Sequence, residues 1–254
     1  MKIQFIIAGW YYNQDSLING LIELKKSNKE VSVFYACHKE PTQIIKDNFE
    51  WKLFPNVGLS EGAYAQATDY LNIEDDTICF WVHDDIIIKD WSFVPRCASA
   101  LTDHGYKVIG NCCNYPTHFD PDEIREFGPT PEWDNKSLRE YIKEKNRHIF
   151  DKKRYLGHCI RSSFSSFQFK SLKEVGGWEY MDYEPLINEE GIPHFRKELG
   201  IGGLGNLPLV MMSYKYNKIF GKEKIAFLSS DYLDSPFIYE CARGEIDPNN
   251  PMKD

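Results

Sequence analysis

The chain lacks any long apolar run, and no stretch approaches the roughly 20 apolar residues that a helix needs to span a bilayer. Its first residues, Met1-Lys2-Ile3, run directly into a strand-like segment without the layout of a signal peptide. Basic runs are missing too, and the formal net charge is -8. These absences predict a soluble, cytoplasmic protein without a nucleic-acid partner, and they leave peripheral association with a membrane open.

Several motifs of common site classes are also absent. The number of cysteines, seven, is odd, and no CxxC pair or Cys/His metal spacing occurs, so we expect reduced thiols rather than a disulfide framework. No GxGxxG follows the first strand-like run, which argues against a nicotinamide enzyme. The first loop, Ala8 to Tyr12, is neither Gly-rich nor basic, which argues against a nucleotidyltransferase.

The first half of the chain alternates strand-like and helix-like patterns. Apolar runs at 3–8, 31–37, 51–54 and 77–82 are typical of strands, and the last suits a central strand covered on both faces. Between them, two helices are predicted, one capped by Asp15 or Ser16 and the other by Ser60. This succession predicts an α/β fold with an open, mostly parallel central sheet flanked by helices.

The second half is less regular. Residues 114–157 hold four prolines, many charges and one plausible helix around 138–149, and we interpret them as an insertion into the sheet pattern that forms a lid or an acceptor-side lobe. The regular pattern resumes with a strand at 158–169 and a helix at 170–175 that ends at a Gly-Gly pair. A helix is expected at 195–199 and a late strand at 207–212.

The most informative stretch is the acidic end of the apolar run at 77–82, where His83, Asp84 and Asp85 follow directly. In open α/β sheets, ligands bind beyond the carboxyl ends of the strands. Two adjacent carboxylates repel each other unless a cation neutralises them, and Mg²⁺ or Mn²⁺ takes such oxygen ligands and bridges to substrate phosphates. The doublet therefore indicates a divalent-cation site, with a solvated turn as the alternative.

The segments around this doublet resemble family 2-like GT-A glycosyltransferases. Residues 56–67 supply an Asn-x-Gly turn and a small-residue helix, and the apolar strand then ends in an acidic motif of the DxD type. Tyr12-Asn13 is similar to the opening Tyr-Asn of the family, and Trp91 stands where an aromatic residue is usual. Val175-Gly176-Gly177-Trp178 is similar to the Val-Gly-Gly-aromatic of the second half.

The resemblance implies a GT-A fold and transfer of a sugar from a UDP-, GDP- or dTDP-linked donor to an acceptor hydroxyl, assisted by Mn²⁺ or Mg²⁺. It implies inversion, a glycan or lipid-linked acceptor, and a place in surface glycan or polysaccharide synthesis. One domain over 1–254 is expected, with a nucleotide-sugar-binding half at 1–113, the insertion or lid at 114–157, and an acceptor half with a tail at 158–254.

Residue by residue, the resemblance makes Asp85 the metal ligand and lets Asp84 share the metal or face the ribose. The nucleotide is expected near His83 at the head of the motif, near Tyr12 and Asn13, and near Gly62 in the small-residue helix. The family often has an acidic residue after its second strand. This chain reads Cys37-His38-Lys39-Glu40 there, and Glu40 is the substitute.

The resemblance also implies a catalytic carboxylate, which takes the proton of the acceptor hydroxyl. Glu189-Glu190 fits the acidic pair that follows the Gly-Gly of the family, Asp182 and Glu184 are competitors, and a charged helix N-terminus is the alternative interpretation. Many relatives place a metal-binding His after the last core strand, where this chain has none. That difference motivates a second hypothesis, a catalytically inactive nucleotide-sugar-binding partner protein.

Overall fold

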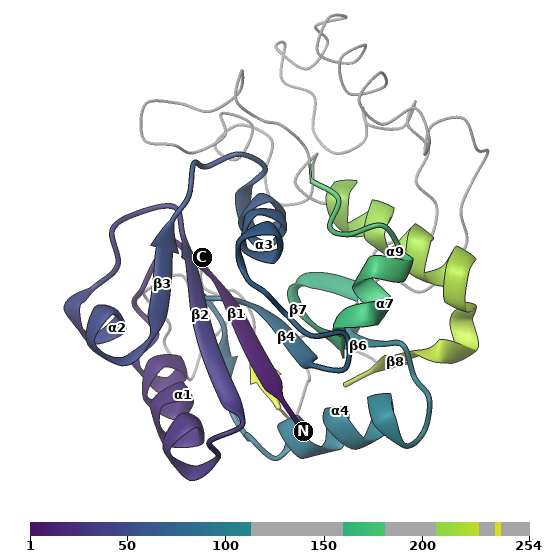
Figure 1. The fold of residues 1–254 in the computed structure, drawn as a ribbon, viewed down its shortest axis with the longest axis horizontal. Helices are drawn as coiled ribbons and strands as arrows, with labels where there is room; N and C mark the ends of the chain where they lie inside the picture. Colours follow the sequence, from purple (N-terminus) through teal and green to yellow (C-terminus); the bar gives the residue numbers. More distant parts are fainter. Residues whose placement is uncertain (113–159, 181–206, 229–236, 240–254) are drawn as a thin grey trace, which may run out of the picture.

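The computed structural model describes residues 1–112, 160–180, 207–228 and 237–239. A seven-stranded sheet in the order β3-β2-β1-β4-β7-β6-β8 forms its centre (Figure 1). Only β7 runs against its two neighbours, β4 and β6, and all other neighbouring strands are parallel. The prediction of a mostly parallel α/β fold is therefore confirmed. The strands are β1 (Ile3–Gly9), β2 (Val31–Cys37), β3 (Glu50–Leu53), β4 (Ile78–His83), β6 (Val108–Cys112), β7 (Ile160–Gln168) and β8 (Ile225–Phe227).

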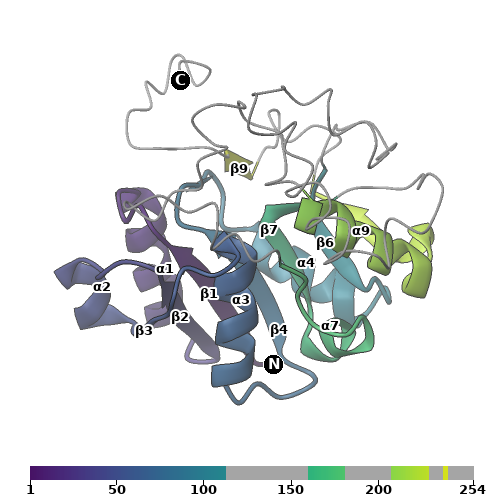
Figure 2. The same ribbon diagram turned by 90° about the horizontal axis from the view of Figure 1, so that it is seen from above.

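Helices cover both faces of the sheet (Figure 2). Buried side chains of α1, α2 and α4 pack with alternate strand residues such as Phe5 and Ile7, whereas α3, α7 and α9 pack with the intervening ones such as Ile6. This division follows from the period of two in a strand, where successive side chains point to opposite faces. The helices are α1 (Asp15–Ser27), α2 (Gln43–Asn48), α3 (Leu59–Tyr70), α4 (Phe93–Thr102), α7 (Phe169–Glu174), α9 (Leu207–Phe220) and the short 3-10 helix η4 (Lys222–Lys224).

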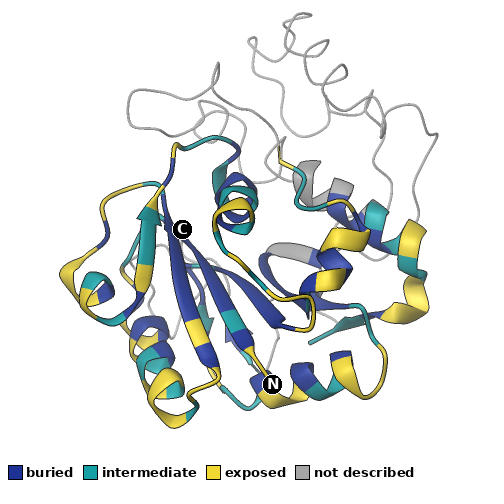
Figure 3. Cartoon of the chain, in the orientation of Figure 1, coloured by how far each residue is buried: buried dark blue, intermediate teal, exposed yellow. Residues whose placement is uncertain are grey.

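The central strand β4 is buried along its length except at its last residue, His83 (Figure 3). Phe80 stacks on Phe5 of β1 with ring centroids 4.7 Å apart, and Trp81 lies on the opposite face of the sheet. A strand covered on both faces has no solvent-facing row, which is why its sequence is a continuous apolar run. The packed strand therefore fixes the positions of His83, Asp84 and Asp85 at its carboxyl end.

A second, two-stranded sheet joins residues that are far apart in the sequence. β5 (Ile87–Ile88) pairs antiparallel with β9 (Ile238–Tyr239), and the Lys89 amide donates to the Phe237 carbonyl over 2.7 Å. Ile238 is fully buried in the core cluster that contains Phe93. Residues 237–239 thus pack directly against the segment that follows the acidic doublet.

Some expected elements differ from the structure. The late strand predicted at 207–212 is wrong, because these residues begin helix α9, whose Met212 and Tyr216 are one turn apart and face the core. A short apolar run fits a buried helix as well as a strand. Helices α1 and α3 begin at Asp15 and Leu59 after Gln14 and Gly58, without the expected side-chain caps. The insertion at 114–157 and the helices expected at 138–149 and 195–199 lie outside the described residues.

Three cysteines in the described ranges, Cys37, Cys79 and Cys97, are free thiols, and all are buried. Burial raises the pKa of Cys37 and of Cys97 to about 12. These thiols are therefore unreactive side chains of the core. In the part of the chain that the structure describes, none of the helices has the length and apolar character to cross a bilayer.

Replacing Ile238 with Ala is expected to lower the free energy of unfolding by about 2–4 kcal/mol, because it removes a fully buried side chain and leaves a cavity. Urea denaturation measures the change. Ile219→Ala is the matched control, since Ile219 on α9 is 48% exposed, and it should cost under about 0.5 kcal/mol. Equal losses in the two variants would contradict the packing of β9 on the core.

Candidate functional site

The strand order reverses direction at the boundary between β1 and β4. From β1 the chain proceeds outward through β2 to β3, and α3 then returns it to the other side of β1, where β4 lies. At such a topological switch point the loops leave the sheet in opposite directions and open a crevice beyond the carboxyl ends of the strands. The loop after β1 and the acidic end of β4 meet there.

Asp84 connects the end of β4 to the loop after β1 at this switch point. One of its carboxylate oxygens, Oδ2, accepts hydrogen bonds from the backbone amides of Trp10 (2.7 Å), Tyr11 (2.7 Å) and Tyr12 (2.9 Å). Successive N–H groups that converge on one oxygen form an anion-binding nest, here occupied by a side chain of the protein itself. Sequence reasoning placed Asp84 at the metal or the ribose and missed this bracing of the β1–α1 loop. Its contact with a metal or a ribose stays a prediction.

The surroundings of Asp84 also change its acidity. Burial, at 4% exposure, raises the pKa of the carboxyl to about 7, and the neighbouring charge of Asp85 acts in the same direction. The hydrogen bonds from the three backbone amides act in the opposite direction but do not cancel the desolvation. The carboxyl therefore changes its charge near neutral pH.

Asp85 and His83 stand beside this nest. Asp85 is 6% exposed, and its Oδ1 lies 3.7 Å from Nδ1 of His83, a distance that makes an ion pair when the imidazole is protonated. The His83 ring lies 6.2 Å from the ring of Tyr64 on α3. An imidazole and a carboxylate thus share one end of β4, as the sequence predicted.

A divalent cation is compatible with these groups. Mg²⁺-type sites use one or two carboxylates and complete the shell with substrate phosphates and water. Asp85 supplies such a carboxylate, whereas Oδ2 of Asp84 is already engaged by amides. Within the described residues, no group of three or more His, Cys, Asp or Glu side chains is arranged to hold a metal ion by itself.

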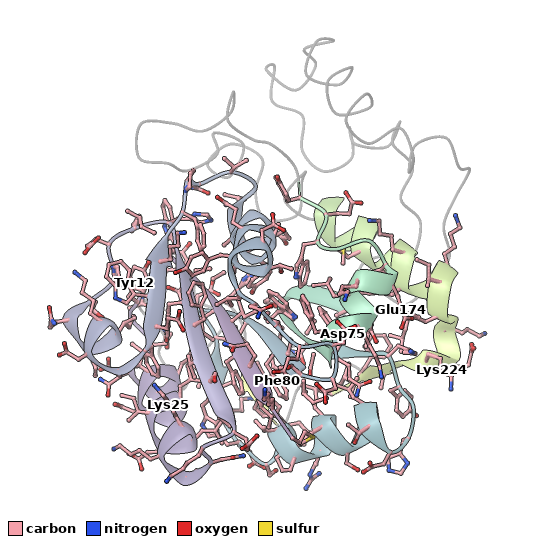
Figure 4. All side chains as sticks on the ribbon, viewed as in Figure 1. Tyr12, Lys25, Asp75, Phe80, Glu174 and Lys224 are labelled. Carbon is pink, nitrogen blue, oxygen red and sulfur yellow. The ribbon has the colours of Figure 1, made fainter. Side chains whose placement is uncertain are left out.

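Tyr12 braces the same loop and Asn13 does not. Tyr12, which is labelled in Figure 4, has a left-handed backbone with φ of 54°. Its hydroxyl donates to the carbonyl of Lys39 over 2.7 Å. Its ring covers Gly9 so closely that a Cβ at Gly9 would lie 2.6 Å from the ring. Asn13 is exposed, and its side-chain oxygen accepts from Gln14 over 3.2 Å. The expected nucleotide contacts of both residues stay predictions.

The remaining donor-side candidates have local packing roles. Glu40 is exposed and pairs with Lys46 on α2. Gly62 is required by a close approach of backbone, because a Cβ there would lie 1.5 Å from the carbonyl oxygen of Val57. The turn before α3 is also held by His38, whose Nε2 lies 2.9 Å from the Leu59 carbonyl oxygen. Direct contact of Glu40 or Gly62 with a nucleotide stays a prediction.

Sequence reasoning did not single out Glu61, which is only 3% exposed in the first turn of α3 and accepts a hydrogen bond from Ser60 over 2.9 Å. A carboxylate two residues after the start of a helix was the available signal.

The structure buries much of Trp178, whose ring lies 5.0 Å from that of Tyr64 and 5.2 Å from that of Trp81. The candidate bases Glu189, Glu190 and Asp182 lie outside the described residues.

Asp84→Ala is expected to lower the free energy of unfolding by about 2–4 kcal/mol, because three backbone amides lose their acceptor. At pH 4, where the folded wild type keeps this carboxyl protonated, Asp84→Asn keeps an oxygen at the same place and should cost about 1 kcal/mol or less. Urea denaturation of both variants at one pH tests the difference. Equal losses would mean that the nest contributes little.

The stability of the wild type should also depend on pH through Asp84. The folded pKa of about 7 exceeds the ordinary value of 3.8, so this stabilisation is complete below the ordinary value and is lost as the pH rises toward the folded value. Asp84→Asn lacks the titrating group. In EDTA, the stability of Asp84→Asn relative to the wild type should therefore rise between pH 5 and pH 7, from a small cost at low pH to a gain near neutral pH. A gap that stays constant would contradict the raised pKa.

Comparisons with known proteins give no family. No family model and no curated protein matches the chain. Among solved structures, galactosyltransferase LgtC with donor and acceptor sugar analogues is similar, with a TM-score of 0.40 and 12% identity over 91% of this chain and 74% of that one. Mannosyltransferase PcManGT from Pyrobaculum calidifontis in complex with GDP-Man and Mn²⁺ is also similar, with a TM-score of 0.37 and 12% identity over 76% of this chain and 53% of that one. A mannose-6-phosphate isomerase from Helicobacter pylori has a TM-score of 0.35 and 16% identity over 69% of this chain and 74% of that one. At these values the activity has to be argued from the site.

Proposed function

We propose that the chain is a glycosyltransferase that moves a sugar from a nucleotide-diphosphate donor to an acceptor hydroxyl with the help of a divalent cation. The observation that carries the proposal is the pair of buried carboxylates, Asp84 and Asp85, at the end of β4 and at the switch point of the sheet. Ligands of α/β proteins bind at this place, and phosphorylated ligands reach carboxylates through a metal ion.

The two carboxylates have different proposed roles on the donor side. Asp84 holds the β1–α1 loop through its three amide contacts and thereby fixes the backbone beside the proposed donor site. Asp85 would hold Mn²⁺ or Mg²⁺ together with the phosphates of the donor. When bound, the cation offsets the charge of the departing diphosphate. The acidic protein thus binds an anionic donor despite its net charge of -8.

The acceptor side of the proposal rests on the sequence. The acceptor hydroxyl oxygen attacks the anomeric carbon, the bond from that carbon to the diphosphate oxygen breaks, and a carboxylate takes the hydroxyl proton. Glu189 or Glu190 is the proposed base, with Asp182 as the competitor. A single displacement of this kind inverts the anomeric centre. The acceptor is proposed to be a glycan or a lipid-linked sugar of surface glycan or polysaccharide synthesis, and the protein to be cytoplasmic.

The second candidate is a nucleotide-sugar-binding partner protein without catalytic activity. The observation in its favour is that the described residues contain no cluster of three metal-ligating side chains. This candidate predicts metal-assisted donor binding without cleavage of the bond between sugar and diphosphate. Release of free nucleotide diphosphate from a bound donor would rule it out.

Asp85→Asn is expected to abolish Mn²⁺-dependent cleavage of the donor while the protein stays folded, with a loss of about 100-fold or more, the usual effect of removing one group that stabilises the transition state. The measurement uses UDP-, GDP- and dTDP-sugars, with binding followed by calorimetry with and without Mn²⁺, and turnover followed by nucleotide release. Asp69→Asn, at an exposed position of α3, is the matched control.

Full activity of Asp85→Asn would contradict the proposed metal site. If the wild type binds none of the three donors, the proposed function is wrong. The same assay on Glu189→Gln, Glu190→Gln and Asp182→Asn identifies the base, because the variant of the true base keeps donor binding and loses turnover.

A further inference from the structure

The acidic doublet is followed by a short segment that the core holds in place. Ile86 is fully buried and Ile88 is 6% exposed, and both belong to the core cluster on the side of α1 and α4. Trp91 packs closely against α1, because a Cβ on Gly20 would lie 2.3 Å from its ring. Asp85 thus stands at the start of a stretch whose side chains are anchored at several points.

The backbone of this segment is paired with residues far along the chain. β5 pairs antiparallel with β9, and Ile88 lies opposite Ile238. The amides of Lys89 and Asp90 both donate to the carbonyl oxygen of Phe237, over 2.7 and 3.4 Å. An isolated two-stranded ribbon is marginally stable in water, so this one needs an anchor in the core.

Ile238 is that anchor. Its side chain is fully buried in the core cluster that also contains Ile88 and Phe93. The neighbouring Phe237 ring lies 6.4 Å from the ring of Phe93, and the guanidinium carbon of Arg96 lies 5.5 Å from its centroid. Residues 237 and 238 therefore connect the segment after the doublet to helix α4 and to the core.

The position of Asp85 decides how well its carboxylate can serve a divalent cation. Mg²⁺ takes oxygen ligands at about 2.0–2.1 Å in near-ideal octahedral geometry, so a small displacement of a ligand weakens binding. Groups that hold a ligand in place without touching the metal change metal affinity by about 10–100-fold when they are removed. Only Ile86 separates Asp85 from β5, which begins at Ile87. Loosening of β5 would therefore reach the carboxylate directly.

We propose that Ile238 is a positioning residue of the metal site. Its side chain holds β9 in the core, β9 holds β5 by backbone pairing, and β5 fixes the carboxylate of Asp85. This proposal rests on the function proposed above. Asp84 is held independently, by the amides of the β1–α1 loop, so a change at Ile238 acts on Asp85 and leaves that contact in place.

Ile238→Ala is expected to weaken Mn²⁺ binding by about 10-fold, the usual effect of removing a group that supports a metal ligand. Calorimetric titration of Mn²⁺ into the folded variant measures it, in the presence of whichever of UDP, GDP and dTDP the wild type binds. Ile238→Val keeps most of the buried volume and should bind Mn²⁺ within about twofold of the wild type. Should Ile238→Ala fail to fold, Phe237→Ala takes its place, because that ring is only half-buried.

Leu172→Ala is the matched control for a general loss of stability. Leu172 is 1% exposed on α7, which follows β7 where Gln168 pairs with Ile78 at the amino end of β4, away from Asp85. The variant should lose comparable stability in urea and bind Mn²⁺ as the wild type does. Equal weakening of Mn²⁺ binding in both Ala variants would overturn the proposal, because metal affinity would then follow stability alone.

Hydrogen exchange without metal tests the link between β9 and β5. The Lys89 amide, which donates to Phe237, should exchange about 10-fold faster or more in Ile238→Ala than in the wild type. The Phe54 amide, which donates to the Cys37 carbonyl over 2.7 Å, should keep its rate. Unchanged exchange at Lys89 would show that Ile238 does not hold β5, and the proposal would be wrong.

Two further outcomes separate this proposal from the proposed function. If the wild type binds Mn²⁺ together with a nucleotide and Ile238→Ala binds it equally tightly, the positioning role is wrong and the function stands. If the wild type binds no Mn²⁺ with any of the three nucleotides, both proposals fail.

Discussion

The convergence of three backbone amides on one carboxylate oxygen of Asp84 is the interaction on which the candidate site depends. It joins the end of β4 to the loop after β1 across the switch point of the sheet. A buried carboxylate that has lost its water needs such donors, and a loop whose amides point inward needs an acceptor. Each side therefore satisfies the other, and the loop after β1 is held in place before any ligand binds.

Further hydrogen bonds connect the other loops at the carboxyl ends of the strands. The hydroxyl of Tyr12 ties the loop to the end of β2 at Lys39, and the ring of His38 ties β2 to the turn before α3. The strained positions lie here as well, with positive φ at Tyr12 and Leu59. Backbone strain persists where the surroundings over-determine it, and it gathers at functional sites. The loops at this edge thus form one braced unit, and a ligand there would meet prepared surfaces.

The continuous apolar run that became β4, the second strand at 31–37 and the acidic doublet that follows β4 could all be recognised in the sequence, because each depends on local composition or on the period of side chains. The antiparallel direction of β7 and the pairing of β5 with β9 could not be recognised, since these pairings join residues far apart in the chain. The expected strand at 207–212 failed for a related reason, because a short apolar run becomes strand or helix according to the surface on which it packs.

The sequence by itself determined the α/β class, the mostly parallel sheet and the place of the carboxylates at the end of a buried strand, since burial follows from the period of the side chains and parallel pairing from the alternation of strands with helices. Only the tertiary structure decided what each candidate does. Asp84 became the acceptor for a distant loop, Glu40 turned toward Lys46, and Lys39 came to lie on Trp10. The physical reason is that a hydrogen bond or a charge contact depends on which backbone and side chains meet across strands, and residue order alone does not specify that.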